Sequence, residues 1–389
     1  MAFGDIGSII ESFEYDTESG KTASVLKLDT GIVAIWYLGT GADMWVKTYP
    51  VDAAGDIGAL IDSWDFHPTT SNGAYYHPFV VKTAGNVYVV CYRGQRLPQP
   101  PYETWLNIMT MTVAPDGTIT KTAIEYVYFA GLPDPTKLSG FIRKTGTTKY
   151  VAFFDSAGVD PDGHIAVFNV NDNGTGVALT DSWLFDAIGE SPSVIHISGD
   201  IFAISYNNGT NAVLKTFSVN DAGAITKAWI DTETIQSSTI YPHKIEHVAG
   251  SVYAVFSEAT STVRTYTIAG DGAITALSSG NFSAVALLEI RVLAIGTQGA
   301  NTVFLVGGRT SWDGKLSTVP ISDAGVVGAI IDAIDIHAGQ TQFMYNHSEP
   351  QDGIYLISWS DTPAADGFID TIDVDDITAI PRSQGVLIG

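Results

Sequence analysis

The sequence is short of cysteine and of positive charge, and each shortage excludes a class of protein. Its one cysteine, Cys91, cannot form an internal disulfide or a thiolate metal cluster by itself. It lies in an apolar run, which predicts a buried core thiol. Only 19 basic residues stand against 42 acidic ones, and the net charge of −23 repels nucleic acids and anionic lipid surfaces. We therefore expect no nucleic-acid partner.

Long apolar runs are also lacking. No stretch approaches the roughly 20 apolar residues that a helix needs to cross a bilayer, so we expect no membrane insertion. Residues 1–13 contain neither a basic segment nor an apolar core, so no signal peptide is visible in this chain. What the chain does contain is 45% hydrophobic residues and 39 glycines. This balance is typical of a folded protein with many tight turns between short strands.

The clearest positive feature is a repeat of roughly 50 residues. Two successive copies, 193–225 and 244–274, match position by position. Each ends in a glycine-containing turn that is followed closely by isoleucine. This glycine recurs through the whole chain and marks seven units, at Gly4, Gly55, Gly117, Gly174, Gly223, Gly272 and Gly325.

Each unit contains four short β-type runs, here named a, b, c and d. In the fourth copy they cover 192–198, 201–206, 213–219 and 225–235. Short glycine-containing turns join a to b and c to d. Four-stranded antiparallel units at this period are typical of propeller blades. The predicted fold class is therefore all-β, a seven-bladed β-propeller.

The order of the runs predicts how the ring closes. The chain opens with a d-type run, 5–13, and its last copy supplies only a, b and c, at 342–347, 354–359 and 368–374. The N-terminal strand is therefore predicted to be the outer strand of the last blade, which would leave no unpaired edge. We expect one domain, 1–380, followed by a short tail, 381–389.

A resemblance supports this interpretation. The pattern Gly-x-Ile, then Ile-Asp-x-x-x-Phe, then Pro-x-x-x-x-Val-x-Gly-x-Val-Tyr-Ala-Val resembles a propeller repeat of prokaryotic, metagenomic and viral surface proteins, mostly of unassigned function. The resemblance covers nearly the whole chain and implies a scaffold rather than a chemistry. The sequence lacks the Gly-His and Trp-Asp pairs of WD repeats. It also lacks the full sialidase Asp-box, of which Ser311-Trp-Asp-Gly is only a fragment.

One face of the ring is predicted to carry the binding surface. The d–a and b–c connections of an antiparallel blade emerge together, and the residues added to the repeat fall in them, at 66–77, 93–105, 155–163 and 309–314. Aromatic and arginine side chains there suit a glycan or a protein partner. The alternative is an insertion whose aromatic residues pack on the neighbouring blade. The candidate ligand-binding residues are Tyr75, Tyr76, His77, Arg93, Arg96, Tyr102, Trp105 and Trp312.

The same face carries a weak calcium signal. Asp155, Asp160 and Asp162 offer oxygen ligands at spacings that Ca²⁺ accepts, but the full twelve-residue calcium loop is lacking. A plain tight turn explains the Asp-Gly pair that follows. We therefore expect no cofactor, with calcium as the one alternative.

No local enzyme motif is present. The chain lacks a Gly-x-Ser-x-Gly elbow, a His-Glu-x-x-His pair and a P-loop. The expected function is a non-catalytic structural or recognition module on a virion (tail, fibre or capsid) or on a prokaryotic cell surface. Its partner would be a glycan, a protein or a neighbouring subunit of an assembly.

Propeller enzymes place catalytic residues on separate blades, however, so the missing motifs do not exclude catalysis. The alternative function is a polysaccharide-active hydrolase or lyase with its site at the axial mouth of the ring. A pair of carboxylates, or a histidine–carboxylate pair, at that mouth would distinguish this alternative from the non-catalytic module.

Overall fold

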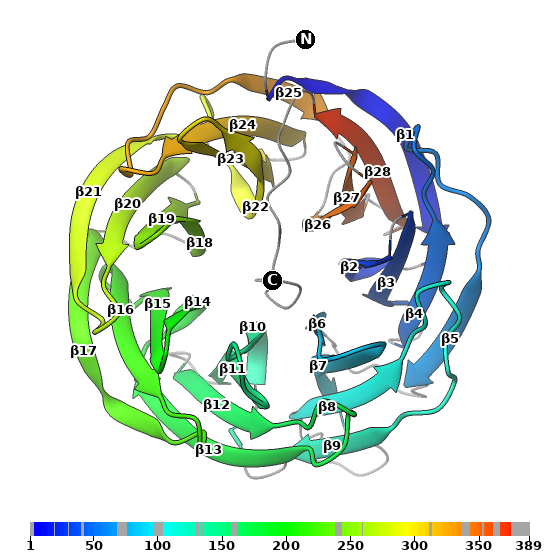
Figure 1. The fold of residues 1–389 in the computed structure, drawn as a ribbon, viewed down its shortest axis with the longest axis horizontal. Coiled ribbons are helices and arrows are strands. Elements are labelled where there is room, and N and C mark those ends of the chain that lie inside the picture. The colour runs from blue at the N-terminus through cyan, green and yellow to red at the C-terminus, as the bar shows by residue number, and fades with distance from the viewer. Residues whose placement is uncertain are drawn as a thin grey trace.

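The computed structural model is an all-β ring of seven four-stranded antiparallel sheets (Figure 1). Within the described part of the chain, no helix has the length and apolar character that a membrane crossing requires. The structure describes residues 4–18, 20–29, 31–39, 43–67, 76–95, 104–129, 132–133, 135–156, 162–237, 243–258, 260–310, 313–336, 343–351, 354–360 and 366–374.

Blades 1 to 3 follow one another along the chain, each with its strands in the order a, b, c, d. Blade 1 contains β2 (Lys21–Asp29), β3 (Ile32–Leu38), β4 (Met44–Pro50) and β5 (Asp62–His67). Blade 2 contains β6 (Tyr76–Lys82), β7 (Val87–Gln95), β8 (Thr104–Thr112) and β9 (Glu125–Phe129). Blade 3 contains β10 (Pro135–Arg143), β11 (Lys149–Ser156), β12 (Gly163–Asn169) and β13 (Ala178–Asp186).

Blades 4 to 6 repeat this order, and blade 7 takes its d strand from the start of the chain. Blade 4 contains β14 (Glu190–Ser198), β15 (Ile201–Asn207), β16 (Ala212–Val219) and β17 (Ile225–Gln236). Blade 5 contains β18 (His243–Ala249), β19 (Val252–Ser257), β20 (Thr262–Ile268) and β21 (Ile274–Asn281). Blade 6 contains β22 (Leu288–Gln298), β23 (Asn301–Arg309), β24 (Gly314–Ser322) and β25 (Asp332–Ile336). Blade 7 contains β26 (Phe343–Gln351), β27 (Ile354–Ser360), β28 (Gly367–Val374) and β1 (Ile6–Asp16).

The predicted architecture and its closure are both confirmed. Every a strand lies nearest the axis of the ring and every d strand at the rim (Figure 1). β1 pairs antiparallel with β28, from Ile6 opposite Val374 to Asp16 opposite Gly367. The N-terminal strand β1 and the last described strand, β28, therefore share one sheet, which closes the ring through blade 7.

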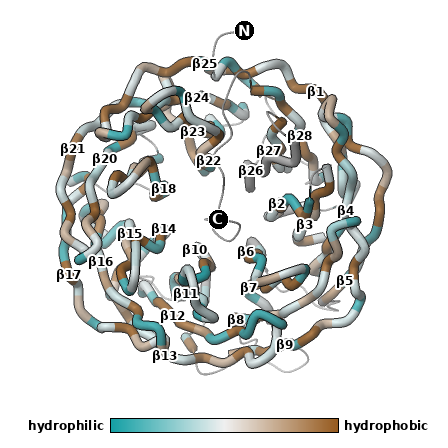
Figure 2. Tube along the Cα trace, viewed as in Figure 1, coloured by the Kyte–Doolittle hydropathy of each residue, from teal (hydrophilic) through white to brown (hydrophobic). Residues whose placement is uncertain are grey.

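The core lies between blades rather than inside them. Strands b are buried along their length, as in β15 and β19, because both faces of each blade are covered by a neighbour. The outer strands are exposed on one side, and hydrophobic and hydrophilic segments alternate along them (Figure 2). Cys91 is fully buried between blades 2 and 3, as predicted, and burial raises the pKa of its thiol.

The repeated glycine is needed for a turn that joins neighbouring blades. All seven repeat glycines have a positive φ, from 77° at Gly4 to 93° at Gly272, which a side chain would strain. In five blades a buried strand-c threonine donates a hydrogen bond of 2.6–2.8 Å to the carbonyl of this glycine in the next blade. The pairs are Thr48–Gly117, Thr110–Gly174, Thr216–Gly272, Thr265–Gly325 and Thr318–Gly4.

A second contact explains the Ile-Asp part of the repeat. A strand-d aspartate accepts a hydrogen bond of 2.8–3.0 Å from the backbone N–H of the isoleucine that follows the turn glycine of the next blade. The aspartates that accept this hydrogen bond are Asp62, Asp181, Asp231 and Asp332. In blade 7 the carboxylate of Glu11 accepts the equivalent hydrogen bond from the Ile57 N–H of blade 1. Each blade therefore orients the turn of its neighbour.

Blade 3 lacks the threonine and uses charged contacts on the same face of the ring. Val167 stands at the threonine position, opposite Val151 and Asp181. The buried Lys144 ammonium instead contacts the carboxylates of Asp200 and Asp221 in blade 4, at 2.5 and 2.6 Å.

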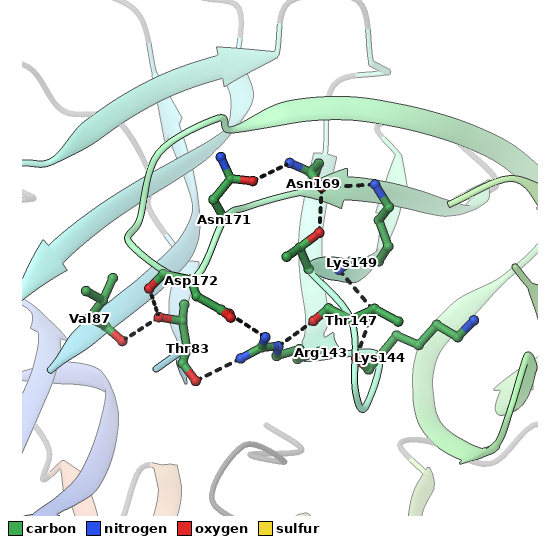
Figure 3. Close-up of polar contacts among 10 residues, drawn as sticks. Thr83, Val87, Arg143, Lys144, Thr147, Lys149, Asn169, Asn171 and Asp172 are labelled. Atoms are coloured by element: carbon green, nitrogen blue, oxygen red, sulfur yellow. Dashed lines mark hydrogen bonds and ion pairs between the residues drawn. The ribbon is translucent and has the colours of Figure 1, made fainter. Parts of the chain in front are cut away.

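The adjacent Arg143 contacts blade 2. Its guanidinium donates a hydrogen bond to the carbonyl of Thr83 in blade 2, and it also binds the carbonyl of Thr147 and the carboxylate of Asp172 within blade 3 (Figure 3). Charged side chains therefore join blade 3 to the blades on both sides of it.

The threonine contact yields a test of stability. In Thr216→Val the carbonyl of Gly272 loses its donor while the side-chain shape is kept, and we expect a loss of about 1–2 kcal/mol in the free energy of unfolding. Chemical denaturation measures the change. Val167→Thr is the matched control, because it adds the same hydroxyl where blade 3 has none and should not destabilise the ring. Unchanged stability in Thr216→Val would mean that the contact contributes nothing.

Candidate active site

Charged side chains from four consecutive blades lie around one end of the ring axis, here called the mouth. Because neighbouring strands are antiparallel, the start of each a strand lies beside the end of each b strand, on the face of the d–a and b–c connections. The charged residues at this mouth, called the mouth cluster, are Lys137, Asp155, Glu190, Lys244, Glu258, Glu289, Arg291 and Arg309.

The electrostatic interactions place this cluster around the axis. Lys137 starts blade 3, yet its charge acts on Lys244 and on Glu258 of blade 5, with blade 4 between them in the chain. Lys137 is exposed, and its ammonium also donates a hydrogen bond to the Ser191 hydroxyl of blade 4 at 3.0 Å. Interactions between blades 3 and 5 are expected where the a strands lie close to the ring axis.

Glu258 is a buried carboxyl group at the mouth. It follows the last residue of β19 and is 4% exposed. Burial, and then the charge of Glu289, raise its pKa to about 8, against the opposing effects of Arg291, Lys137 and Arg309. Glu258 therefore holds a proton at neutral pH.

Glu289 is held beside it by an arginine. The guanidinium of Arg309 donates two hydrogen bonds to the two carboxylate oxygens, at 2.9 and 3.0 Å. Such two-point contacts fix the plane of a carboxylate. The two acids thus have different environments, since Glu258 is buried with a raised pKa and Glu289 is ion-paired.

The backbone is irregular where several a strands begin at the mouth. Strand a begins with a register shift in blades 1, 4 and 6, and each shift contains one residue other than glycine with positive φ. These residues are Thr22 at 53°, Ser191 at 50° and Glu289 at 53°. Left-handed residues of this kind are strained, and β-bulges redirect side chains near functional sites. The strain occurs at the mouth and includes an acid of the cluster.

Lys244 is a buried amine beside like charges. It is 7% exposed, and burial lowers the pKa of its ammonium well below the usual value. The charges of Arg291 and Lys137 lower it further, while Glu246 and Glu258 act in the opposite direction. An amine in this environment gives up its proton more readily than an exposed lysine.

A second pair of acids lies between blades 3 and 4. Asp155 is 6% exposed, and burial raises its pKa to about 7. The charge of Lys137 and a hydrogen bond from the Ser191 N–H lower this pKa, whereas the charge of Glu190 raises it. That N–H lies 3.4 Å from the Asp155 carboxylate. The buried Oε2 of Glu190 has no hydrogen-bond partner among the described residues, so it offers an acceptor to a bound molecule.

Few of the residues predicted from sequence fall in this cluster. Tyr75, Arg96, Tyr102 and Trp312 lie outside the described residues, as do the side chains of Tyr76 and His77.

Two members of that set are described. Arg93 pairs with Tyr76 across β6 and β7 and is half-buried. Trp105 is 7% exposed and stacks on Tyr128 with ring centroids 4.6 Å apart. The recognition patch stays a prediction.

The calcium hypothesis also stays a prediction. Asp160 lies outside the described residues, and Asp155 contacts the Ser191 N–H. The backbone carbonyl of Asp162 accepts a hydrogen bond from Ser156. Among the described residues, no three His, Cys, Asp or Glu side chains form a group that would hold a metal ion.

Sequence reasoning missed the mouth cluster, although a signal for it exists. Asp155, Asn207 and Glu258 each stand six residues after the first residue of strand b, in three successive blades. Two of these are acids at the end of a mostly apolar run, Asp155 directly after Phe154 and Glu258 after Phe256 and Ser257. Counting repeat positions would have selected both acids with raised pKa values.

Comparison with known proteins supports the fold. The sequence matches no protein-family model and no curated protein. The periplasmic gluconolactonase of Pseudomonas aeruginosa is similar in structure, with a TM-score of 0.55, 12% identity, and coverage of 82% of this chain and 86% of that chain. An ulvan lyase, described as a new family of polysaccharide lyase, has a TM-score of 0.55 and 11% identity, covering 98% of this chain and 97% of that chain. An ulvan lyase bound to -[GlcA(1-4)Rha3S]- gives a TM-score of 0.54 and 12% identity over the same shares.

These comparisons contradict the expected function. The similar structures named above are a lactonase and a polysaccharide lyase, so they favour the enzyme alternative over a non-catalytic structural or recognition module. They give no support to a virion component. At 11–12% identity the likeness itself establishes the propeller fold alone, and any activity of this chain has to be argued from its own residues.

The raised pKa of Glu258 predicts how stability depends on pH. The folded state binds this proton more tightly than the unfolded chain, whose carboxyl has the ordinary value of 4.5, so the free energy of unfolding falls as pH rises from about 4.5 to about 8. The lowered pKa of Lys244 acts in the opposite sense, because its contribution to the free energy of unfolding rises as pH increases towards the ordinary lysine value of 10.5. Comparing Glu258→Gln with the parent chain isolates the first effect.

We expect Glu258→Gln to gain stability relative to the parent as pH rises through that window. Thermal unfolding at steps between pH 5 and pH 9 measures the difference. Two parallel curves would show that Glu258 has no raised pKa.

Proposed function

We propose that this chain is a polysaccharide-cleaving enzyme whose reaction takes place at the mouth cluster, with Glu258 as the general acid. The observation that carries the proposal is the Glu258–Glu289 pair. A buried acid with a pKa of about 8 stands beside a second acid that an arginine holds in an ion pair. Environments that separate the proton affinities of two neighbouring acids are the usual means of dividing acid and base roles in catalysis.

The reaction class follows from what such a pair does. Breaking a glycosidic linkage requires a proton for the leaving oxygen, and a carboxyl group that is protonated at neutral pH supplies it. Glu258 fits this role. Glu289, fixed by Arg309, is the complementary group that accepts a proton or stabilises positive charge, and Lys244 is a second proton acceptor.

The extent of the site favours a polymer over a small sugar. The cluster spans blades 3 to 6 around the ring axis, and its second acid pair, Asp155 and Glu190, lies on the opposite side of blade 4 from Glu258. Glu190 Oε2 is available to accept a hydrogen bond from a sugar hydroxyl. A chain of several sugars would occupy both acid pairs. Because such polymers are mostly extracellular, we place the activity outside the cytoplasm.

The proposal predicts the effect of one neutral substitution. Glu258→Gln keeps the shape but cannot donate a proton, so we expect kcat to fall by roughly 100- to 10,000-fold. In the parent chain, kcat should decline as pH rises above about 8, because Glu258 then loses its proton. The assay incubates the protein with a panel of neutral and anionic polysaccharides and measures new chain ends. Product masses distinguish hydrolysis, which adds one water per cut, from elimination, which adds none.

Glu18→Gln is the matched control. It makes the same change at an exposed carboxylate in the connection between β1 and β2, outside the mouth cluster, and should leave kcat unchanged. The proposal is wrong if the parent cuts no member of the panel, or if Glu258→Gln keeps the parent rate.

A further inference from the structure

Two polar side chains lie opposite each other where blade 4 meets the mouth. Glu190 begins β14 and pairs in register with Asn207, the last residue of β15. Directly opposite residues of an antiparallel pair point to the same face of the sheet, with Cβ atoms about 4.5–5.5 Å apart. Asn207 is fully buried and Glu190 is half-buried, so a ligand reaches the pair from the side of Glu190.

Each of these side chains ends in a buried atom that has no hydrogen-bond partner in the part of the chain that the structure describes. The atoms are Oε2 of Glu190 and Nδ2 of Asn207. The orientation of the amide is set by its other end, because Oδ1 accepts a hydrogen bond from the Gly209 N–H at 2.9 Å. One hydrogen-bond donor and one acceptor therefore stand side by side.

A third atom extends this polar strip away from the mouth. Ser205 lies two residues before Asn207, and so on the same face of β15. Its fully buried Oγ also lacks a partner among the described residues. Buried polar groups in folded proteins are nearly always paired, since an unpaired group loses its hydration without a replacement. Three such atoms on one face of one blade indicate a place that a polar guest completes.

The combination of a donor and an acceptor selects the chemistry of the guest. A sugar hydroxyl accepts a hydrogen bond through its oxygen and donates one through its proton, so it satisfies Asn207 and Glu190 together. A carboxylate or sulfate group has no proton to donate to Glu190, and an ammonium group has no lone pair to accept from Asn207. Of these four groups only the hydroxyl fits both side chains.

The repeat places this pair beside the proposed reaction. Asp155, Asn207 and Glu258 stand at the same position after the start of strand b in blades 3, 4 and 5, so Asn207 lies one blade away from Glu258 around the axis. Resting on the proposed function, we propose that Glu190 and Asn207 form a subsite that binds a free hydroxyl group of the sugar unit next to the one cleaved at Glu258. The substrate is then a polysaccharide whose units keep this hydroxyl free of sulfate, methyl and acyl groups.

Binding is measured without turnover, in Glu258→Gln, so that the subsite is tested apart from catalysis. The probes are hexamers of glucose, mannose, xylose and galacturonic acid, each in its native form and with all hydroxyl groups O-methylated. Methylation keeps the rings and linkages but removes every hydroxyl proton. We expect at least one native hexamer to bind, and to bind at least tenfold more tightly than its methylated form.

Exchanging the donor and the acceptor gives a sharper test in the same background. Asn207→Asp keeps an oxygen for the Gly209 N–H but loses the donor, and Glu190→Gln loses the carboxylate acceptor. We expect each change to weaken binding of the native hexamer by roughly tenfold. The double variant has its donor at position 190 and its acceptor at position 207, so a hydroxyl again satisfies both. Its affinity should return to within about threefold of that of Glu258→Gln, whereas a purely structural role would make the two losses add.

Asn281→Asp and Glu18→Gln are the matched controls. They make the same two changes at exposed positions, in the outer strand β21 and in the connection between β1 and β2. Both should leave binding unchanged. The melting temperature of each variant shows whether it is folded, and if Asn207→Asp does not fold, Glu190→Gln at the half-buried position decides alone.

The outcomes separate the two proposals. The subsite is overturned if no hexamer binds, if native and methylated forms bind equally, if the losses add in the double variant, or if both single variants keep their affinity, which would mean that the buried atoms bind water only. If the parent chain still cleaves a polysaccharide, the proposed function stands without the subsite. Hydroxyl-selective binding that both single variants weaken, with no cleavage of any polysaccharide, supports the subsite and overturns the proposed function.

Discussion

The ring depends on hydrogen bonds that run from each blade to the glycine turn of the next. A buried threonine hydroxyl reaches the glycine carbonyl, and a strand-d carboxylate reaches the isoleucine N–H two residues later. Both contacts satisfy backbone groups that the packing of one blade against another would otherwise leave buried and unpaired. Because the turn requires positive φ, the glycine is essential to both. The conformation of the turn and the packing of one blade against the next therefore depend on the same glycine.

This constraint also closes the ring and positions the site. Thr318 of blade 6 donates to Gly4, and Asp332 accepts from Ile6, so the first residues of the chain are held in the same way as every internal turn. With the blades held at fixed angles, the starts of the a strands converge on one mouth. The acids with raised pKa values lie at the interfaces between blades 3 and 4 and between blades 5 and 6. The spacing of the catalytic candidates is therefore determined by the packing of blades.

The fold was predictable from sequence because its signal is repeated. Seven glycines, five of them followed two residues later by isoleucine, and the recurring Ile-Asp pair carry the contacts described above. A run of d type at the N-terminus leaves only one way to complete blade 7. The site was not predictable in the same way. Glu258 and Glu289 occupy different positions in the repeat and come from different blades. The raised pKa of Glu258 depends on burial, and the ion pair of Glu289 depends on Arg309. Loop length and aromatic content instead predicted Trp105 as a ligand-binding residue, and in the structure its ring stacks on Tyr128.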